Sequence, residues 1–219
     1  LFTTSDGFGK DGLASLQELA PKYGLTIAAS ESFAATDTDM TTQLVKMRDS
    51  GAGAIVTWTI GPAGARVAKN VKQLGITIPL FQSHGIPDPK YVELAGDAAN
   101  GTMMPSTKLM VVDQLPKTDP QKAVIEEFVR LYRDQYKFDK EYPINTHSGY
   151  AWDAVYILAN AMKKAGTDPE KLRAALEQTK GFVGVSGIFT MTPEDHNGLH
   201  LDSMVIVKVA DGKWQLLQN

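Results

Sequence analysis

The sequence contains no cysteine, so it can form no disulfide bond, no thiolate metal site and no cysteine nucleophile. It also lacks an apolar run of the roughly 18 residues that a membrane-spanning helix needs. No block of Lys and Arg is present and the net charge is −3, so the positive surface that attracts nucleic acid is not expected. These absences argue against thiol chemistry, a spanning helix and nucleic acid as a partner.

The start of the chain lacks the features of a complete secreted precursor. No charged segment followed by an apolar one opens the sequence, as a signal peptide would. The first residue is not Met, and residues 1–4 have the pattern of the end of a strand. We therefore expect a processed or truncated chain, from which a signal peptide could also have been removed.

Alternating strand and helix patterns fill the first part of the chain. The overall composition, 43% hydrophobic and 21% charged, is that of an ordinary folded protein. Helical spacings that end at glycine separate the apolar runs. Such βα units predict an α/β fold with a parallel open sheet and helices on both faces, because right-handed crossovers allow little else. The predicted strands after the first lie at residues 25–30, 54–58, 78–82 and 101–104.

The pattern changes near residues 115–120. Three helices are predicted in the middle of the chain, over residues 119–135, 147–165 and 168–181. The tail is rich in strand patterns, and Asp211-Gly212 is a hairpin signal within it. The predicted segments are an α/β domain, a helical segment and a β-rich C-terminal tail, at residues 1–116, 117–181 and 182–219.

A glycine pattern of the G-x-G-x-x-G type follows the first predicted strand and opens a helix. Its glycines are Gly7, Gly9 and Gly12. Together with Glu31 after the next strand, the pattern has the context of a dinucleotide motif, so an NAD-dependent oxidoreductase is one interpretation. Asp6 and Asp11 flank the turn, however, and their carboxylates would oppose a pyrophosphate at the helix N-terminus. We favour the alternative, in which the glycines allow close packing and the acids stabilise the start of the helix.

Three loops that follow predicted strands combine glycine, a polar group and a large apolar or aromatic side chain. Ligands of open parallel sheets bind beyond the carboxyl ends of the strands, so these loops form the candidate site. They suit a small ligand with a polar head and an apolar body. For the histidine, a hydrogen bond to that head is a better interpretation than catalysis, since no carboxylate is near it in sequence. The candidate ligand-binding residues are Phe8, Trp58, Thr59, Ile60 and His84.

Signatures of catalysis and metal binding are missing. The sequence contains no G-x-S-x-G, H-E-x-x-H, P-loop or C-x-x-C pattern. Residues 195–198 resemble the opening of a calcium loop but lack its later Glu, so a polar turn is the better interpretation. His147, His196 and His200 do not have the spacing of metal ligands. We expect no catalytic residue, no metal and no cofactor.

Several stretches, taken in order and spacing, resemble the later part of periplasmic substrate-binding proteins. That family binds branched-chain amino acids and related hydrophobic acids for ABC uptake systems, and the resemblance spans nearly the whole chain. It implies a type I periplasmic binding protein fold, with two α/β lobes that are joined by three hinge crossings and close on a ligand. The stretches are FGKDG, AGAIVTW, GPAGARVAKNVKQLG, GDAANGTM, GYAWDAVYILANAM and GVSGIFTMTPEDHNGLH.

The resemblance also implies which part of a binding protein this chain represents. Residues 1–116 would form most of the second lobe, residues 117–181 would be helices of an incomplete first lobe, and residues 182–219 would lie near the hinge, mainly with the second lobe. The leading part of the first lobe, which grips the ligand carboxylate in the family, would be absent. The exposed apolar area would favour a dimer or strand exchange.

The resemblance places Phe8 where the family often has an aromatic ring against the ligand, and residues 58–60 in another ligand-facing turn. Amino-acid-binding members tend to have a carboxylate at the position of His84, where it pairs with the ligand ammonium. We therefore hypothesise a ligand without the ammonium, such as an aromatic or branched aliphatic carboxylate, with a branched-chain amino acid as the alternative.

The implied function is capture by lobe closure and delivery to an ABC permease, with no chemical step. The implied location is the periplasm, or the outside of the cell on a membrane tether. A sensory ligand-binding domain of the same fold is a further interpretation.

Overall fold

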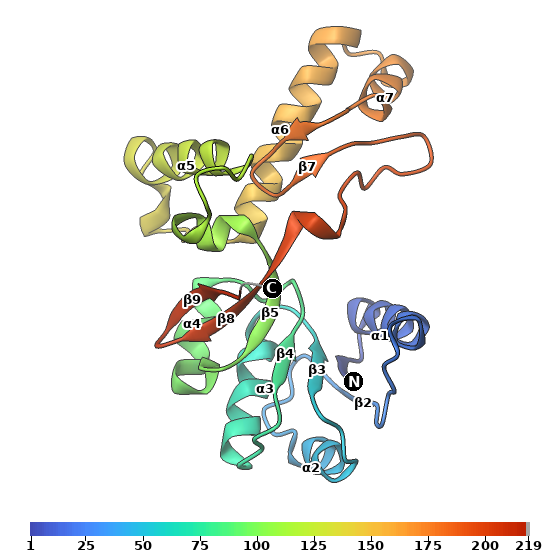
Figure 1. Cartoon of the computed structure of the whole chain (residues 1–219), viewed down its shortest axis with the longest axis vertical. Coiled ribbons are helices and arrows are strands. Elements are labelled where there is room, and N and C mark those ends of the chain that lie inside the picture. The colour runs from blue at the N-terminus through green and yellow to red at the C-terminus, as the bar shows by residue number, and fades with distance from the viewer. Residues whose placement is uncertain (218–219) are drawn as a thin grey trace. The chain divides into compact units, whose positions relative to one another are not determined.

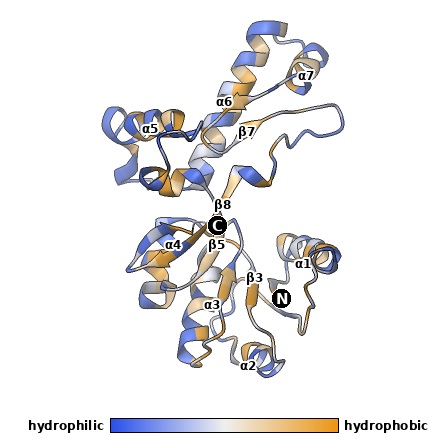
Figure 2. Ribbon diagram, viewed as in Figure 1, coloured by the Kyte–Doolittle hydropathy of each residue, from blue (hydrophilic) through white to orange (hydrophobic). Residues whose placement is uncertain are grey.

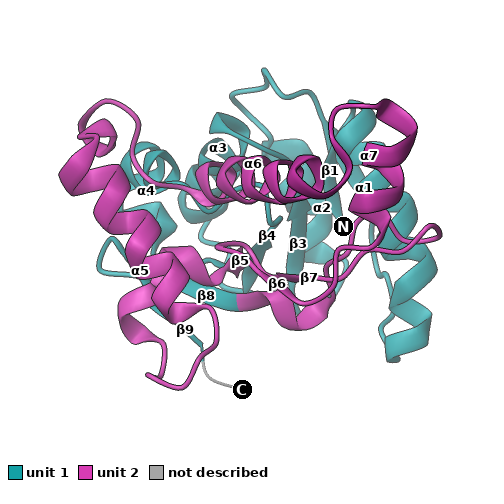
Figure 3. Ribbon diagram, turned by 90° about the horizontal axis from the view of Figure 1, so that it is seen from above, with its two compact units in different colours: residues 1–105, 206–219 teal, residues 106–205 magenta. Residues whose placement is uncertain are grey.

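The computed structural model describes residues 1–217, and the chain divides into two compact units. Among the described residues, unit 1 contains residues 1–105 and 206–217, and unit 2 contains residues 106–205 (Figure 3). The borders fall inside β5 (Met103–Thr107) and β8 (Met204–Ala210), each of which runs from one unit into the other.

These borders differ from the predicted ones. The predicted β-rich tail is divided, because residues 182–205 belong to unit 2 and residues 206–217 belong to unit 1, while residues 218–219 lie outside the described residues. Both borders fall inside strands and not in a linker, so the change of pattern near residues 115–120 does not mark them. The assignment of the segments to the two lobes of a longer binding protein stays a prediction.

Unit 1 is built on a mostly parallel sheet with the strand order β2-β1-β3-β4-β5-β8-β9 (Figure 1). Neighbouring strands from β2 to β5 run parallel, whereas β9 pairs with β8 in the antiparallel sense. The predicted α/β class with a parallel sheet is confirmed. The other strands of this sheet are β1 (Phe2–Thr4), β2 (Glu31–Phe33), β3 (Ile55–Trp58), β4 (Leu80–Gln82) and β9 (Lys213–Leu216).

The predicted hairpin at Asp211-Gly212 is confirmed. Asp211 and Gly212 both have positive φ, at 48° and 72°, between the paired residues Ala210 and Lys213. Two central residues with positive φ give the twist that joins adjacent antiparallel strands.

In the described part of unit 1, four α-helices cover the sheet. In the sheet order, β2 lies on one side of β1, whereas β3, β4 and β5 follow one another on its other side. The connection from β1 to β2 therefore crosses the sheet in the opposite direction to the three connections that follow. Because these crossovers are right-handed, α1 lies on one face of the sheet and α2, α3 and α4 lie on the other. Contacts of α3 with both α2 and α4 agree with this arrangement. β3 is hydrophobic along much of its length (Figure 2). The helices are α1 (Gly7–Leu19), α2 (Thr41–Asp49), α3 (Pro62–Gln73) and α4 (Pro89–Ala95).

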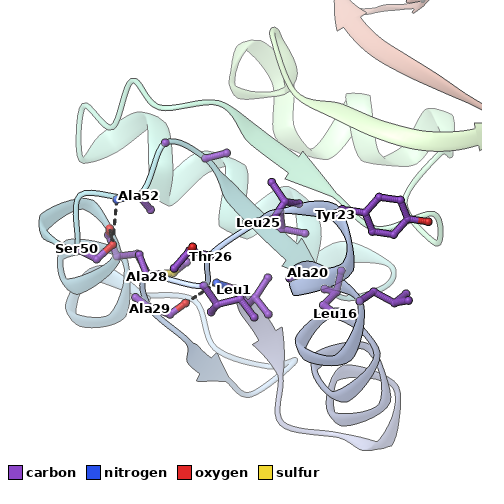
Figure 4. Close-up of a pocket in the computed structure, with 16 residues that line it drawn as sticks. Leu1, Leu16, Ala20, Tyr23, Leu25, Thr26, Ala28, Ala29, Ser50 and Ala52 are labelled. Carbon is purple, nitrogen blue, oxygen red and sulfur yellow. Dashed lines mark hydrogen bonds between the residues drawn. The ribbon is translucent and has the colours of Figure 1, made fainter.

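The predicted strand at residues 25–30 is wrong. Strand β2 begins at Glu31, which pairs with Phe2. In this parallel register residues 25–29 lie beyond the N-terminal end of β1, and within residues 1–217 they join no ladder. The amino group of Leu1 donates to the Ala29 carbonyl at 2.7 Å. The segment instead lines an apolar cavity of about 500 Å³, together with α1 residues such as Leu16 (Figure 4).

Unit 2 contains helices and a short hairpin. The predicted helices at 119–135, 147–165 and 168–181 are confirmed, with bounds that differ by a few residues at some of their ends. The first of them continues into a π-helical turn at Leu131–Gln135. Within residues 1–217 no helix has the length and hydropathy of a membrane span. The elements are α5 (Lys122–Arg130), α6 (Thr146–Ala165), α7 (Pro169–Glu177), β6 (Phe182–Val183) and β7 (Ile188–Phe189).

A buried carboxylate on α6 holds the turn of this hairpin. Asp153 is 1% exposed and accepts hydrogen bonds from the backbone N–H groups of Val185 and Ser186, both at 2.7 Å. Burial raises the pKa of the Asp153 carboxyl, and the two backbone hydrogen bonds oppose that rise without cancelling it.

The raised pKa gives a prediction for stability. Between the unfolded pKa of about 4 and the higher folded pKa, the folded state binds more protons, so the free energy of unfolding falls as pH rises, by up to about 1.4 kcal/mol per unit of pKa difference. Asp153→Asn should remove this part of the pH dependence. Urea unfolding of both proteins between pH 4 and 7 measures it, and parallel curves would contradict the assignment.

Candidate functional site

Three aromatic rings meet at the carboxyl ends of β1, β3 and β4. The rings of Phe8 and Trp58 are stacked, with centroids 5.8 Å apart and planes at 25°. His84 meets Trp58 edge-on at 5.4 Å and lies 5.9 Å from Phe8. Phe8 lies in the first turn of α1, Trp58 is the last residue of β3, and His84 lies in the loop after β4. The structure therefore brings together the three rings that the sequence placed at one edge of the sheet, while their contact with a ligand stays a prediction.

Local structure fixes the position of Phe8. The Asp6 side chain caps α1 by accepting hydrogen bonds from the Gly9 N–H at 2.9 Å and from the Thr4 hydroxyl at 3.0 Å. This cap begins the helix directly after β1 and places Phe8 in its first turn. The predicted role of Asp6 in stabilising the helix start is confirmed.

The alternation of β3 sets the direction of Trp58. Ile55 and Thr57 are buried, whereas Val56 and Trp58 are partly exposed. Successive side chains of a strand point to opposite faces, so Trp58 lies on the face that α1 covers. This is why its ring meets Phe8.

Packing explains two of the three glycines of the motif, Gly9 and Gly12, whereas a Cβ on Gly7 would have nothing within 4 Å. A Cβ on Gly9 would lie 1.8 Å from the Thr4 carbonyl oxygen, and one on Gly12 would lie 2.1 Å from Trp58 Cδ1. Asp6 already accepts the Gly9 N–H at the helix start, where a pyrophosphate would have to bind. Glu31 is paired with Lys46 at 3.3 Å. These contacts favour the packing interpretation over the dinucleotide interpretation.

The residues after Trp58 connect the loops that follow β3 and β4. The Ser83 hydroxyl donates a hydrogen bond to the Thr59 carbonyl. Thr59 is fully buried, and its hydroxyl has no hydrogen-bond partner among the described residues. Ile60 is 51% exposed and lies beside Gly85, on which a Cβ would be 2.6 Å from Ile60 Cγ2. Ile60 is thus accessible in unit 1, whereas a ligand contact through the Thr59 side chain stays a prediction.

Two glycines shape this site through contacts that the sequence does not predict. Gly12 admits the Trp58 ring and Gly85 admits Ile60. Gly12 has one indication in the sequence: glycine inside a helical pattern weakens the helix and needs a reason in packing. The partner of that packing is distant in sequence and follows only from the fold.

The carboxylates in the loops after β1 and β4 cap the helices that follow. Asp6 caps α1, and Asp88 caps α4 by accepting the Lys90 N–H at 2.7 Å. Within residues 1–217, no group of three His, Asp, Glu or Cys side chains could hold a metal ion.

The polar-turn interpretation of residues 195–198 is confirmed. The Asp195 carboxylate accepts hydrogen bonds from the backbone N–H groups of Asn197 and Gly198, at 2.9 and 3.1 Å. His196 pairs with Glu177 at 3.1 Å. Asp195 therefore stabilises the turn, and His196 connects it to α7, so these side chains are explained without a calcium ion.

Comparison with known proteins gives consistent matches. A family model described as "Periplasmic binding protein" matches residues 1–213. The chain is 23% identical over 216 residues to "Leu/Ile/Val-binding protein homolog 1" from Brucella abortus (strain 2308). That alignment covers 97% of this chain and 53% of the relative, so the chain spans about half the length of the relatives it matches.

Solved structures with the same fold include two at 25% identity. One is Rp1789 from Rhodopseudomonas palustris (strain CGA009), with a TM-score of 0.88 over 99% of this chain and 62% of that one. The other is the branched-chain amino acid transporter substrate-binding protein LivJ from Streptococcus pneumoniae in complex with isoleucine. Its TM-score is 0.77, over 99% of this chain and 59% of that one.

Proposed function

This chain belongs to the periplasmic binding protein family, and we propose that it is part of the solute-binding component of an ABC uptake system. The observation that carries the proposal is the convergence of Phe8, Trp58 and His84 at the carboxyl ends of parallel strands. This is the edge where open α/β sheets bind ligands. The isoleucine complex of the LivJ relative supports a small hydrophobic ligand for this fold.

The proposed ligand is a small hydrophobic carboxylate. The rings of Phe8 and Trp58 offer an apolar surface that gains free energy when a ligand body displaces water from it. The proposal assigns His84 a hydrogen bond to the polar head of the ligand. Because Asp6 and Asp88 cap helices, the loops do not present a carboxylate dedicated to an ammonium group. We therefore propose an acid that lacks the amine, with a branched-chain amino acid as the alternative.

Binding in this proposal involves no chemical step. The ligand would be held between the lobes of the whole protein, and closure would be driven by its higher affinity for the closed form. The closed form would deliver the ligand to the permease in the membrane. Membership of the family supports a location in the periplasm or outside the cell.

The proposal predicts a preference between two closely matched ligands. 4-Methylpentanoate, which is leucine without its amine, should bind about ten-fold more tightly than leucine, because a desolvated ammonium without a partner costs free energy. Calorimetric titration measures both affinities on the protein expressed at the full length that its gene encodes. Tighter binding of leucine would overturn the preference. A rise in thermal stability with NAD, and none with 4-methylpentanoate or leucine, would support the oxidoreductase instead.

A further inference from the structure

The indole of Trp58 lies directly against the backbone of α1 at Gly12. A Cβ on Gly12 would be 2.1 Å from Cδ1, 2.2 Å from Nε1 and 2.4 Å from Cγ of Trp58. All three atoms belong to the five-membered ring, so that half of the indole occupies the space of the missing side chain. Real Cβ atoms essentially never approach ring atoms this closely, so any larger residue would displace the ring.

The backbone of α1 does not itself require glycine at this position. Gly12 lies inside the helix and is not among the residues with positive φ. Glycine weakens a helix interior relative to alanine, because it loses more conformational freedom on folding. Gly7, at the start of the same helix, makes no such contact, since a Cβ added there would have nothing within 4 Å. The position of the Trp58 ring is therefore the feature that accounts for Gly12.

Other contacts restrict the same ring. Phe8 is four residues before Gly12, on the same face of α1, and its ring stacks on the indole. His84 meets the indole edge-on from the loop after β4. Gly85 likewise leaves space for a neighbouring side chain, because a Cβ on Gly85 would be 2.6 Å from Ile60 Cγ2. Helix, stacked ring and neighbouring loop together leave the indole little freedom to turn.

We propose that Gly12 is a positioning residue for ligand binding, which fixes the orientation of the Trp58 indole before the ligand arrives. This inference rests on the proposed function. A ring that already has its bound orientation loses less conformational freedom on binding, so the affinity is higher than with a mobile ring. Gly12 itself need not touch the ligand. Its contribution is expected through Trp58 alone.

The test is Gly12→Ala, with Gly7→Ala as a matched control on the same helix. Gly12→Ala should weaken binding of 4-methylpentanoate at least about ten-fold and change the part of the near-ultraviolet circular dichroism that Trp58 contributes. Subtracting the spectrum of Trp58→Phe isolates that part from the other two tryptophans. Gly7→Ala should change neither measurement.

A double variant keeps the test decisive if Gly12→Ala folds poorly. In a Trp58→Ala background the clash is absent, so adding Gly12→Ala should leave thermal stability unchanged or raise it. Wild-type affinity and an unchanged Trp58 spectrum in Gly12→Ala would overturn the inference, as would equal destabilisation in both backgrounds. Failure of the wild type to bind either 4-methylpentanoate or leucine would instead overturn the proposed function. In that case the circular dichroism of Gly12→Ala and the thermal stability of the double variant would still test whether Gly12 positions the Trp58 ring.

Discussion

Gly9→Ala is expected to destabilise unit 1 by about 3 kcal/mol. The added Cβ would lie 1.8 Å from the carbonyl oxygen and 2.6 Å from the carbonyl carbon of Thr4. Both atoms belong to the backbone of β1, so no side-chain rotation can relieve the clash. Helix α1 would have to move away from the sheet. Such a movement would also displace Phe8, which lies one residue before Gly9.

Gly7→Ala provides the matched control for this prediction. Gly7 belongs to the same helix, but a Cβ there would have nothing within 4 Å. Its effect on stability should stay within about 0.5 kcal/mol. Urea unfolding of the wild type and the two variants, monitored by circular dichroism, gives the comparison. If Gly9→Ala were as stable as Gly7→Ala, the close approach of α1 to β1 would be refuted.

Elements with local signals could be predicted from the sequence, and those that depend on distant partners could not. Helix α3 was predictable because Gly61-Pro62 marks its start, its apolar spacing marks its buried face, and Gly75 marks its end. The strand expected at residues 25–30 has a suitable apolar pattern but joins no ladder. Its failure shows that a strand requires a neighbour in the right register, which an apolar run does not reveal.

The candidate site also has features that could be predicted from the sequence and features that could not. The convergence of Phe8, Trp58 and His84 followed from topology alone, since parallel strands bring their carboxyl ends to one edge of the sheet. The burial of Thr59 and the contact of Gly12 with the indole did not follow. Both depend on the direction of individual side chains, and that direction is fixed only when helix and strand are packed together.

Trp58→Ala should weaken binding of 4-methylpentanoate about 100-fold, because truncating a large aromatic anchor at the centre of a binding site commonly costs about 2 to 4 kcal/mol. Trp58 is central in the candidate site, since its ring contacts Phe8, His84 and the backbone at Gly12. Its removal takes away apolar surface and also leaves Phe8 without its stacking partner. Calorimetric titration of the protein at the full length that its gene encodes measures the loss.

Trp214→Ala separates a loss of binding from a general loss of packing. Trp214 stacks on Tyr91 in the same unit, with ring centroids 6.5 Å apart. It lies in β9, four strands away from β3 in the sheet order, so its removal should lower thermal stability and leave the affinity of the folded protein within about two-fold of the wild type. Equal losses of affinity in Trp58→Ala and Trp214→Ala would mean that binding depends on the stability of unit 1. A loss confined to Trp58→Ala would locate the ligand at the ring cluster, because only that variant changes the carboxyl ends of β1, β3 and β4.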